Sequence, residues 1–156
     1  MIDWSRMFHT GFVVEDLDSA KTHFQTTLGL QFTDTQIFDP LPFWTPDRGV
    51  HDVVVHACYA QPGPVHLELC QGTGAFYSVT EGPDARHMGL WVDDVAGEVE
   101  TLEQQGWQVL AAGASPNDGY GSICYLRAPL GELVVELVST ELERFIGTWL
   151  ATAKSS

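Results

Sequence analysis

The feature that most constrains the fold of this chain is an internal repeat. The segments that begin at His9 and at His87 both read His-x-Gly-apolar-x-Val-acid-Asp-apolar. A helix-like stretch follows each segment and ends at a glycine. Each half then closes on an apolar strand that contains a glutamate, Glu68 in the first half and Glu136 in the second. Three matches in the same order indicate that the chain contains two copies of one supersecondary unit.

Each copy is predicted to be a βαβββ module. In the first copy, apolar alternation and one helical apolar period predict a strand, a helix and three strands near residues 7–14, 17–28, 30–38, 52–60 and 65–71. The second copy repeats this order near residues 86–92, 95–105, 107–110, 122–127 and 132–138. We therefore predict one α+β domain over residues 1–156, made of module one (5–72), module two (84–140) and a C-terminal amphipathic helix (141–152).

Composition excludes several classes of function. The formal net charge is −14, from 21 acidic residues against 7 Lys plus Arg. Such a surface repels polyanions, so nucleic acid is not an expected partner and a CoA-linked substrate receives no long-range attraction. No apolar stretch reaches the roughly 18 residues of a membrane span, and no secretory signal is visible, so we predict no membrane partner and a cytoplasmic location. The three scattered cysteines favour neither a disulfide framework nor a thiolate zinc site.

Two carboxylates lie in strands where a charge is costly. Glu68 and Glu136 are each surrounded by apolar residues, and an ionised carboxylate in such a strand must be exposed, paired or bound to a metal. A single edge-strand glutamate that faces water, or a single packed histidine, would be unremarkable in a domain of this kind. Here His9 and His87 stand at matching places in the two copies. Two imidazoles and two carboxylates predict a site for a borderline divalent ion: Zn, Ni, Co, Mn or Fe.

The motifs around these residues resemble the vicinal oxygen chelate superfamily. This superfamily includes glyoxalase I, methylmalonyl-CoA epimerase, extradiol dioxygenases, and the fosfomycin and bleomycin resistance proteins. The stretches most similar to the epimerase-like branch are Gly-Pro-Val-His-Leu-Glu-Leu, Arg-His-Met-Gly-Leu-Trp-Val-Asp-Asp-Val and Leu-Val-Val-Glu-Leu-Val, and the resemblance extends over residues 7–138. It implies two half-barrel sheets that face each other around a metal, with His9, Glu68, His87 and Glu136 as ligands. The two modules pair within one chain or between chains in this superfamily, and we expect a homodimer.

The resemblance also implies a chemistry. Members bind two neighbouring substrate oxygens, and the proton-transferring members remove a proton next to a carbonyl through a metal-stabilised enolate. Glu136 is then the candidate base, the alternative being a permanent ligand. The arginine that glyoxalase I places four residues after its first ligand is replaced here by Val13. A second catalytic acid is expected on the third strand of module one, where His56 is the candidate, with a packed or solvated histidine as the alternative.

Five further residues are predicted to contact the substrate. Trp91 shares strand parity with His87 and is expected to face the cavity. His66 shares parity with Glu68 and is expected to line the cavity or to orient Glu68, the alternative being a histidine at the strand end in solvent. Phe43 and Trp44 lie on a proline-rich segment that we interpret as a lid loop, and Tyr120 lies in a glycine-rich turn on the other side. For Phe43 and Trp44 the alternative is plain packing against the body. Together they predict a small substrate with vicinal oxygens that is apolar or aromatic.

Three functions compete at this point. The first is a metal-dependent epimerase, isomerase or lyase that acts by proton transfer next to a carbonyl. The second is an extradiol-type Fe(II) dioxygenase, for which His9, His87 and Glu136 form the two-histidine, one-carboxylate triad. The third is a non-catalytic small-molecule binder of the resistance type. Glu68 discriminates between the first two functions. The dioxygenase triad leaves a metal position open, and Glu68 as a fourth protein ligand would occupy it.

Overall fold

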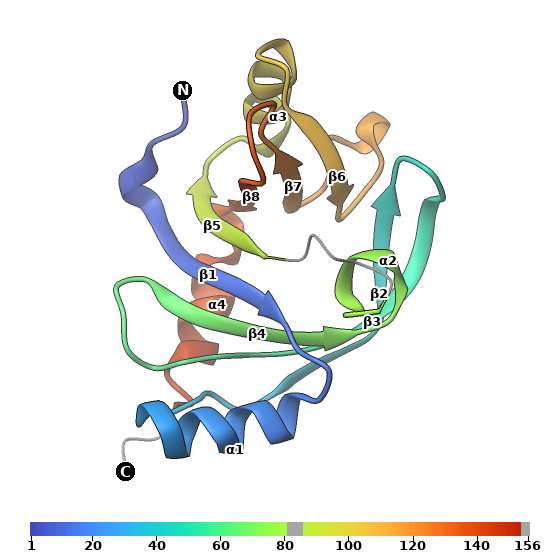
Figure 1. The fold of residues 1–156 in the computed structure, drawn as a ribbon. Helices are drawn as coiled ribbons and strands as arrows, with labels where there is room; N and C mark the ends of the chain where they lie inside the picture. Colours follow the sequence, from blue (N-terminus) through green and yellow to red (C-terminus); the bar gives the residue numbers. More distant parts are fainter. Residues whose placement is uncertain (81–85, 154–156) are drawn as a thin grey trace.

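The two sequence repeats form the two halves of one closed β-barrel. The computed structural model describes residues 1–80 and 86–153 (Figure 1). The strand order around the barrel is β1-β4-β3-β2-β6-β7-β8-β5. The strands are β1 (Met7–Val13), β2 (Gln36–Thr45), β3 (Gly49–Tyr59), β4 (His66–Gly72), β5 (His87–Val92), β6 (Gln108–Ala112), β7 (Ile123–Arg127) and β8 (Val134–Ser139).

The barrel has an approximate twofold symmetry that relates the two modules. In each module the first strand pairs in parallel with the last, β1 with β4 and β5 with β8. The modules join through the antiparallel pair β1–β5 and, at the opposite side of the barrel, through one pairing of β2 with β6. Both joins lie within a single chain, so the predicted α+β fold of two tandem βαβββ modules is confirmed with its modules paired intramolecularly.

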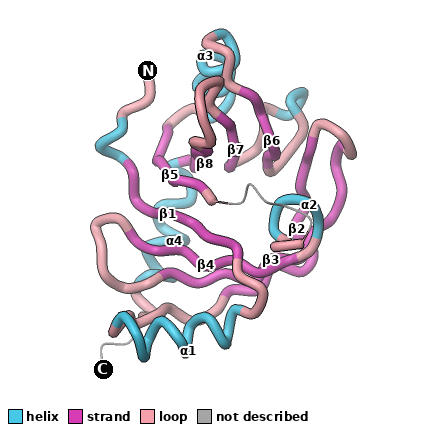
Figure 2. Tube along the Cα trace, in the orientation of Figure 1, coloured by secondary structure: helices cyan, strands magenta, loops and turns pink. Residues whose placement is uncertain are grey.

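Helices cover the outer surface of the barrel and one of its openings. Helix α1 (Leu17–Leu28) contacts β4, and α3 (Val95–Gln104) contacts β6, β7 and β8 (Figures 1 and 2). Asp16 and Asp94 cap these helices through hydrogen bonds to the backbone N–H groups of Ser19 and Gly97. The remaining helical segments are α2 (Gly74–Tyr77), α4 (Glu143–Leu150) and three 3₁₀ turns at Trp4–Arg6, Pro116–Asp118 and Thr140–Leu142.

Three hydrophobic clusters correspond to these layers. One lies inside the barrel, where Ile146 and Trp149 of α4 pack onto the inward side chains of the strands. The other two lie between the sheet and the helices, under α3 and under α1. Cys58, Cys70 and Cys124 are all free and buried, which agrees with the absence of a disulfide framework. None of the described helices is long and apolar enough to cross a membrane.

The prediction for residues 40–46 was wrong, since this segment is not a loop. It forms the second half of β2, which pairs with β3 from Gln36↔Ala57 to Thr45↔Gly49. Pro40 and Pro42 are tolerated because β2 bonds β6 at a single position, so most of its outer edge requires no N–H donor. The register shift between Phe38 and Leu41 also contains Pro40. The predicted strand 30–38 accordingly begins later, at Gln36.

The connection between the modules contains a short helix that the sequence did not indicate. The helix is α2, which occupies Gly74–Tyr77 and packs onto β3 and β4. The predicted start of module two at residue 84 lies outside the described residues. The module boundaries at 5–72 and 84–140 therefore stay a prediction.

Candidate metal centre

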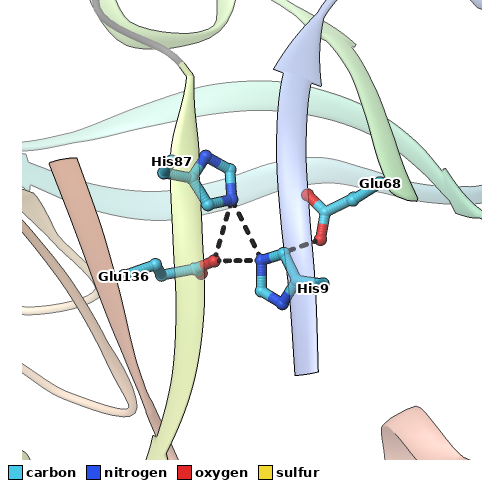
Figure 3. A group of neighbouring side chains, drawn as sticks. All are labelled: His9, Glu68, His87 and Glu136. Carbon is cyan, nitrogen blue, oxygen red and sulfur yellow. Dashed lines mark hydrogen bonds and ion pairs between the residues drawn. The ribbon is translucent and has the colours of Figure 1, made fainter. Parts of the chain in front are cut away.

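Four adjacent strands bring the four predicted ligands together inside the barrel. Glu68 comes from β4, His9 from β1, His87 from β5 and Glu136 from β8, which is their order around the barrel. Their side chains point toward one another (Figure 3), and one ligand atom from each lies within 4.8 Å of the other three. The distances to His9 Nε2 are 3.0 Å from His87 Nε2, 2.9 Å from Glu136 Oε2 and 3.5 Å from Glu68 Oε2.

The register of β1 and β5 explains the glycine in both His-x-Gly motifs. His9 lies opposite Gly89, and Gly11 lies opposite His87. A Cβ atom on Gly89 would overlap the ring of His9, and one on Gly11 would overlap the ring of His87. The glycine of each module therefore leaves the space that the imidazole of the other module occupies. The His-x-Gly motif is repeated because β1 and β5 pair antiparallel about the approximate twofold axis.

The site concentrates negative charge away from water. Glu68 and Glu136 are 7% and 6% exposed, and neither the cluster nor its described contacts include a lysine or arginine. Burial alone would raise the pKa of the Glu136 carboxyl, but hydrogen bonds and charge from His87 and His9 outweigh it and hold this pKa well below its usual value. With both imidazoles neutral, as a metal ligand requires, the two buried carboxylates carry two negative charges, which one divalent cation would neutralise.

The donor spacing suits such a cation. Donors about 2.1 Å from one ion lie roughly 3.0 Å apart when they are adjacent in an octahedron. The separations of His9 Nε2, His87 Nε2 and Glu136 Oε2 are 3.0, 2.9 and 3.1 Å. Four protein donors in an octahedral arrangement leave two positions, the number that a substrate with two vicinal oxygens requires. The residues present therefore fit a divalent ion.

The two carboxylates differ in how firmly they are held. Glu68 accepts a hydrogen bond from the Cys70 thiol at 2.7 Å. Among the described residues, Glu136 is hydrogen-bonded by the two imidazoles and by no thiol or hydroxyl. Val138 takes the place of Cys70 in module two. Glu68 is thus fixed by its surroundings, whereas Glu136 depends on the cluster itself for its position.

A cavity of about 470 Å³ opens from this cluster into the barrel. Its wall is formed by the inward faces of β2, β3 and β7, the segment 121–123 and the C-terminal helix. Glu68 and Glu136 lie at its polar end, and no lysine or arginine occurs among its described lining residues. From α4, Phe145, Ile146 and Trp149 close the other side. The cavity is therefore an apolar, largely aromatic chamber with an anionic end.

The structure does not bring the other predicted site residues to this cavity. His56 alternates with the inward Val55 and Ala57, so it lies on the outer face of β3. His66 bonds the Ala60 carbonyl through Nδ1 at 3.0 Å and packs against the turn at Gly63, rather than against Glu68. The prediction of His56 as an inward second base is corrected, because the register of the β3–β4 hairpin could not be derived from its turn sequence.

The aromatic predictions fall on packing positions. Phe43 is 1% exposed in the interior cluster, and Trp44 packs under α3 near Tyr120 rather than acting as a lid. Tyr120 lies beside α3, with its hydroxyl 3.4 Å from Glu103. Trp91 faces inward as parity predicted, but it stacks on Phe8 at 4.0 Å and does not line the cavity.

The residues that do line the aromatic part of the cavity were missed. They are Tyr59, Tyr77 and Tyr125 together with the α4 residues. Tyr59 and Tyr125 could have been found by extending the repeat comparison to the third strand of each module, since each lies directly across from its glutamate. Tyr77 lies in α2, a helix that no periodic pattern in the sequence predicted.

Metal binding should stabilise the folded chain. At a free Zn²⁺ concentration one hundred times its dissociation constant, the expected gain is about 2.7 kcal/mol. For a domain of this size this corresponds to a Tm increase of roughly 5–10 °C. Differential scanning fluorimetry with Zn, Ni, Co and Mn, each reversed by EDTA, measures it. His87→Ala should abolish the increase, and an equal increase in that variant would contradict the site.

Comparison with known proteins identifies the class of protein that this fold and site define. A family model described as "Glyoxalase/Bleomycin resistance protein/Dioxygenase superfamily" matches residues 8–125. The chain belongs to this superfamily. No curated protein matches it in sequence.

Among solved structures, the chain is similar to methylmalonyl-CoA epimerases. The enzyme from Mycobacterium tuberculosis is 18% identical, with 92% of this chain and 97% of that chain covered and a TM-score of 0.57. The Streptomyces coelicolor epimerase in complex with 2-nitronate-propionyl-CoA is 17% identical, with 97% and 98% covered and a TM-score of 0.56. These likenesses show the fold, and the family model agrees with the superfamily that the motifs predicted.

Proposed function

We propose that this chain is a metal-dependent enzyme that transfers a proton at a carbon next to a carbonyl, as an epimerase, isomerase or lyase. The observation that carries the proposal is the convergence of His9, Glu68, His87 and Glu136 in one buried cluster. A bound divalent ion would act as a Lewis acid on two neighbouring substrate oxygens and stabilise the negative charge that develops as the proton leaves. With Glu68 included, the cluster favours this function over the dioxygenase, whose triad requires a further open position.

Glu136 is the proposed proton acceptor. Its carboxylate lies at the polar end of the cavity and is hydrogen-bonded by no thiol or hydroxyl among the described residues, so it can move toward a substrate carbon. Glu68 is held by the Cys70 thiol, so it is proposed to remain in place. A glutamate that binds a cation is ionised at neutral pH, which is the form that a base requires.

A second carboxylate base is absent from the inner face of β3. Between Val53 and Tyr59 this described strand directs Val53, Val55, Ala57 and Tyr59 inward. His51, opposite Phe43, does not line the cavity. We therefore propose a one-base mechanism, in which Glu136 removes the proton and returns it. A protonated carboxyl exchanges its proton with water that reaches the cavity. Such an enzyme should therefore incorporate hydrogen from the solvent into its substrate.

The cavity supports an apolar or aromatic substrate. Its volume of about 470 Å³ suits a small molecule, and its described lining offers no cation that would bind phosphate or carboxylate groups. All four site residues come from one chain, so the proposed homodimer is not required to complete the site.

Deuterium incorporation tests the proposal. The metal-loaded protein is incubated in D₂O with aromatic α-hydroxyketones and dicarbonyls, and with acyl-CoA thioesters as the charged comparison. We expect exchange at the carbon next to the carbonyl for at least one neutral aromatic substrate, lost in EDTA and absent for the thioesters. Ring cleavage of catechols by the Fe(II)-loaded protein, with no exchange, would instead support the dioxygenase. Ligand binding without either reaction would support the binder.

A further inference from the structure

The approximate twofold symmetry includes a third residue in each module, a buried tyrosine. Tyr59 on β3 lies opposite Glu68, and Tyr125 on β7 lies opposite Glu136. Tyr59 contacts the ring of His9 edge-on with centroids 5.6 Å apart and an interplanar angle of 74°. The ring of Tyr125 contacts that of His87 at 5.1 Å and 80°. Each module therefore contributes one histidine, one glutamate and one tyrosine to the same interior.

The two tyrosines differ in whether the hydroxyl pairs with another hydroxyl. The Tyr125 hydroxyl lies 2.8 Å from the hydroxyl of Tyr77, which comes from α2. Among the described residues Tyr59 is in no such hydroxyl pair, and its ring packs edge-on against His9 and Trp149. The helices that follow the last strand of module two, residues 140–150, contain no tyrosine. The symmetry is thus broken at Tyr125, which lies across from Glu136, the proposed proton acceptor.

The hydroxyl pair has a hydrogen-bond donor left over. Each phenol carries one O–H donor, and a bond between two phenols uses one of the two donors. Tyr77 and Tyr125 are 4% and 2% exposed, and both line the cavity. A donor in an apolar chamber is costly when it has no acceptor, so an occupant of the cavity gains by supplying one. A phenol with its ordinary pKa of about 10 keeps its proton at neutral pH, so each hydroxyl of the pair carries a donor.

We propose that the Tyr77–Tyr125 hydroxyl pair is a substrate-binding subsite that donates a hydrogen bond to a neutral oxygen of the ligand held at the metal centre. The acceptor is a carbonyl, ether or hydroxyl oxygen, because no lysine or arginine among the described lining residues accompanies the pair to stabilise an anion. This inference rests on the proposed function, since it requires a ligand that the metal centre orients. It specifies that the substrate is a neutral aromatic molecule with an oxygen beyond the two that bind the metal.

Paired catechol probes test the subsite. The two hydroxyls of a catechol occupy the metal positions, and a methoxy group adds a neutral acceptor that a methyl group lacks. Isothermal titration calorimetry on the zinc-loaded protein compares 3- and 4-methoxycatechol with 3- and 4-methylcatechol. We expect one methoxy isomer to bind about fivefold more tightly than its methyl analogue, the effect of one net hydrogen bond.

Three variants test whether the Tyr77–Tyr125 pair causes the preference for methoxy over methyl. In Tyr77→Phe/Tyr125→Phe the preference for methoxy over methyl should fall to about one, with zinc content unchanged. Tyr59→Phe, the symmetry-related control, loses one buried hydroxyl in an equivalent place and should keep the preference. The single Tyr125→Phe variant serves if the double variant does not fold. An undiminished preference in these variants, or none in wild type, overturns the subsite alone. If no catechol binds the zinc-loaded wild type, the metal-centred proposal fails together with the subsite.

Discussion

Glu136→Gln is expected to reduce deuterium exchange by roughly a thousandfold, within the usual contribution of a general base. The amide keeps the size of the side chain but cannot accept the proton, and its carbonyl oxygen is a weaker ligand than the carboxylate. Exchange is followed by NMR in D₂O, and bound metal is measured by elemental analysis on the same samples. Since His9, Glu68 and His87 remain, we expect the variant to retain metal when the ion is supplied in excess.

Glu68→Gln is the matched control for this prediction. It makes the same chemical change at the symmetry-related place, where the Cys70 thiol holds the side chain. We expect weaker metal binding and, at saturating metal, a much smaller loss of exchange than in Glu136→Gln. Equal losses in both variants would assign the two glutamates the same role as permanent ligands, and would require another base.

Gly89→Ala is expected to lower metal affinity by at least a hundredfold. The added Cβ would occupy the position of the His9 ring, so the imidazole must leave the cluster or the β1–β5 pair must separate. Overpacking of a buried position of this kind costs about 1–3 kcal/mol in the free energy of unfolding. Calorimetric titration with Zn²⁺ measures the first effect, and chemical denaturation of the metal-free protein measures the second.

Two further glycine substitutions complete the experiment. Gly11→Ala places its Cβ in the ring of His87 and should reproduce the loss, because the two positions are related by the approximate twofold axis. Gly147→Ala, on α4, meets no atom within 4 Å and should leave metal affinity unchanged while stabilising the helix slightly. Wild-type metal affinity in Gly89→Ala would show that the interlocked glycines do not position the histidines.

Much of the metal centre was predictable because its determinants are local and repeated. Strand parity assigns a face to each side chain, and two copies of one motif place His9 with His87 and Glu68 with Glu136. Trp91 was correctly predicted to face inward on the same grounds. The sequence could not predict that Trp91 does not line the cavity. This depends on Phe8, which a register shift in β1 brings under the indole ring.

The remaining features of the site depend on contacts between segments far apart in sequence. Prolines in residues 40–46 suggested a loop, yet they are accommodated because β2 has a nearly unpaired edge, a property of its neighbours and not of its composition. His56 faces outward because of the β3–β4 register. The pairing of Tyr77 with Tyr125 required α2 to fold back onto the interior, which no periodicity could indicate.

The sequence by itself determined the family, the βαβββ repeat and the four residues of the proposed centre, because these follow from residue identity and strand parity. The tertiary structure decided that both modules close one barrel within a single chain, that Glu68 is held while Glu136 is not, and that the chamber beside them is aromatic and carries no cation among its described residues. The physical reason is that periodicity reports which face a side chain occupies, whereas closure, register and cavity shape arise from the packing of distant segments against one another.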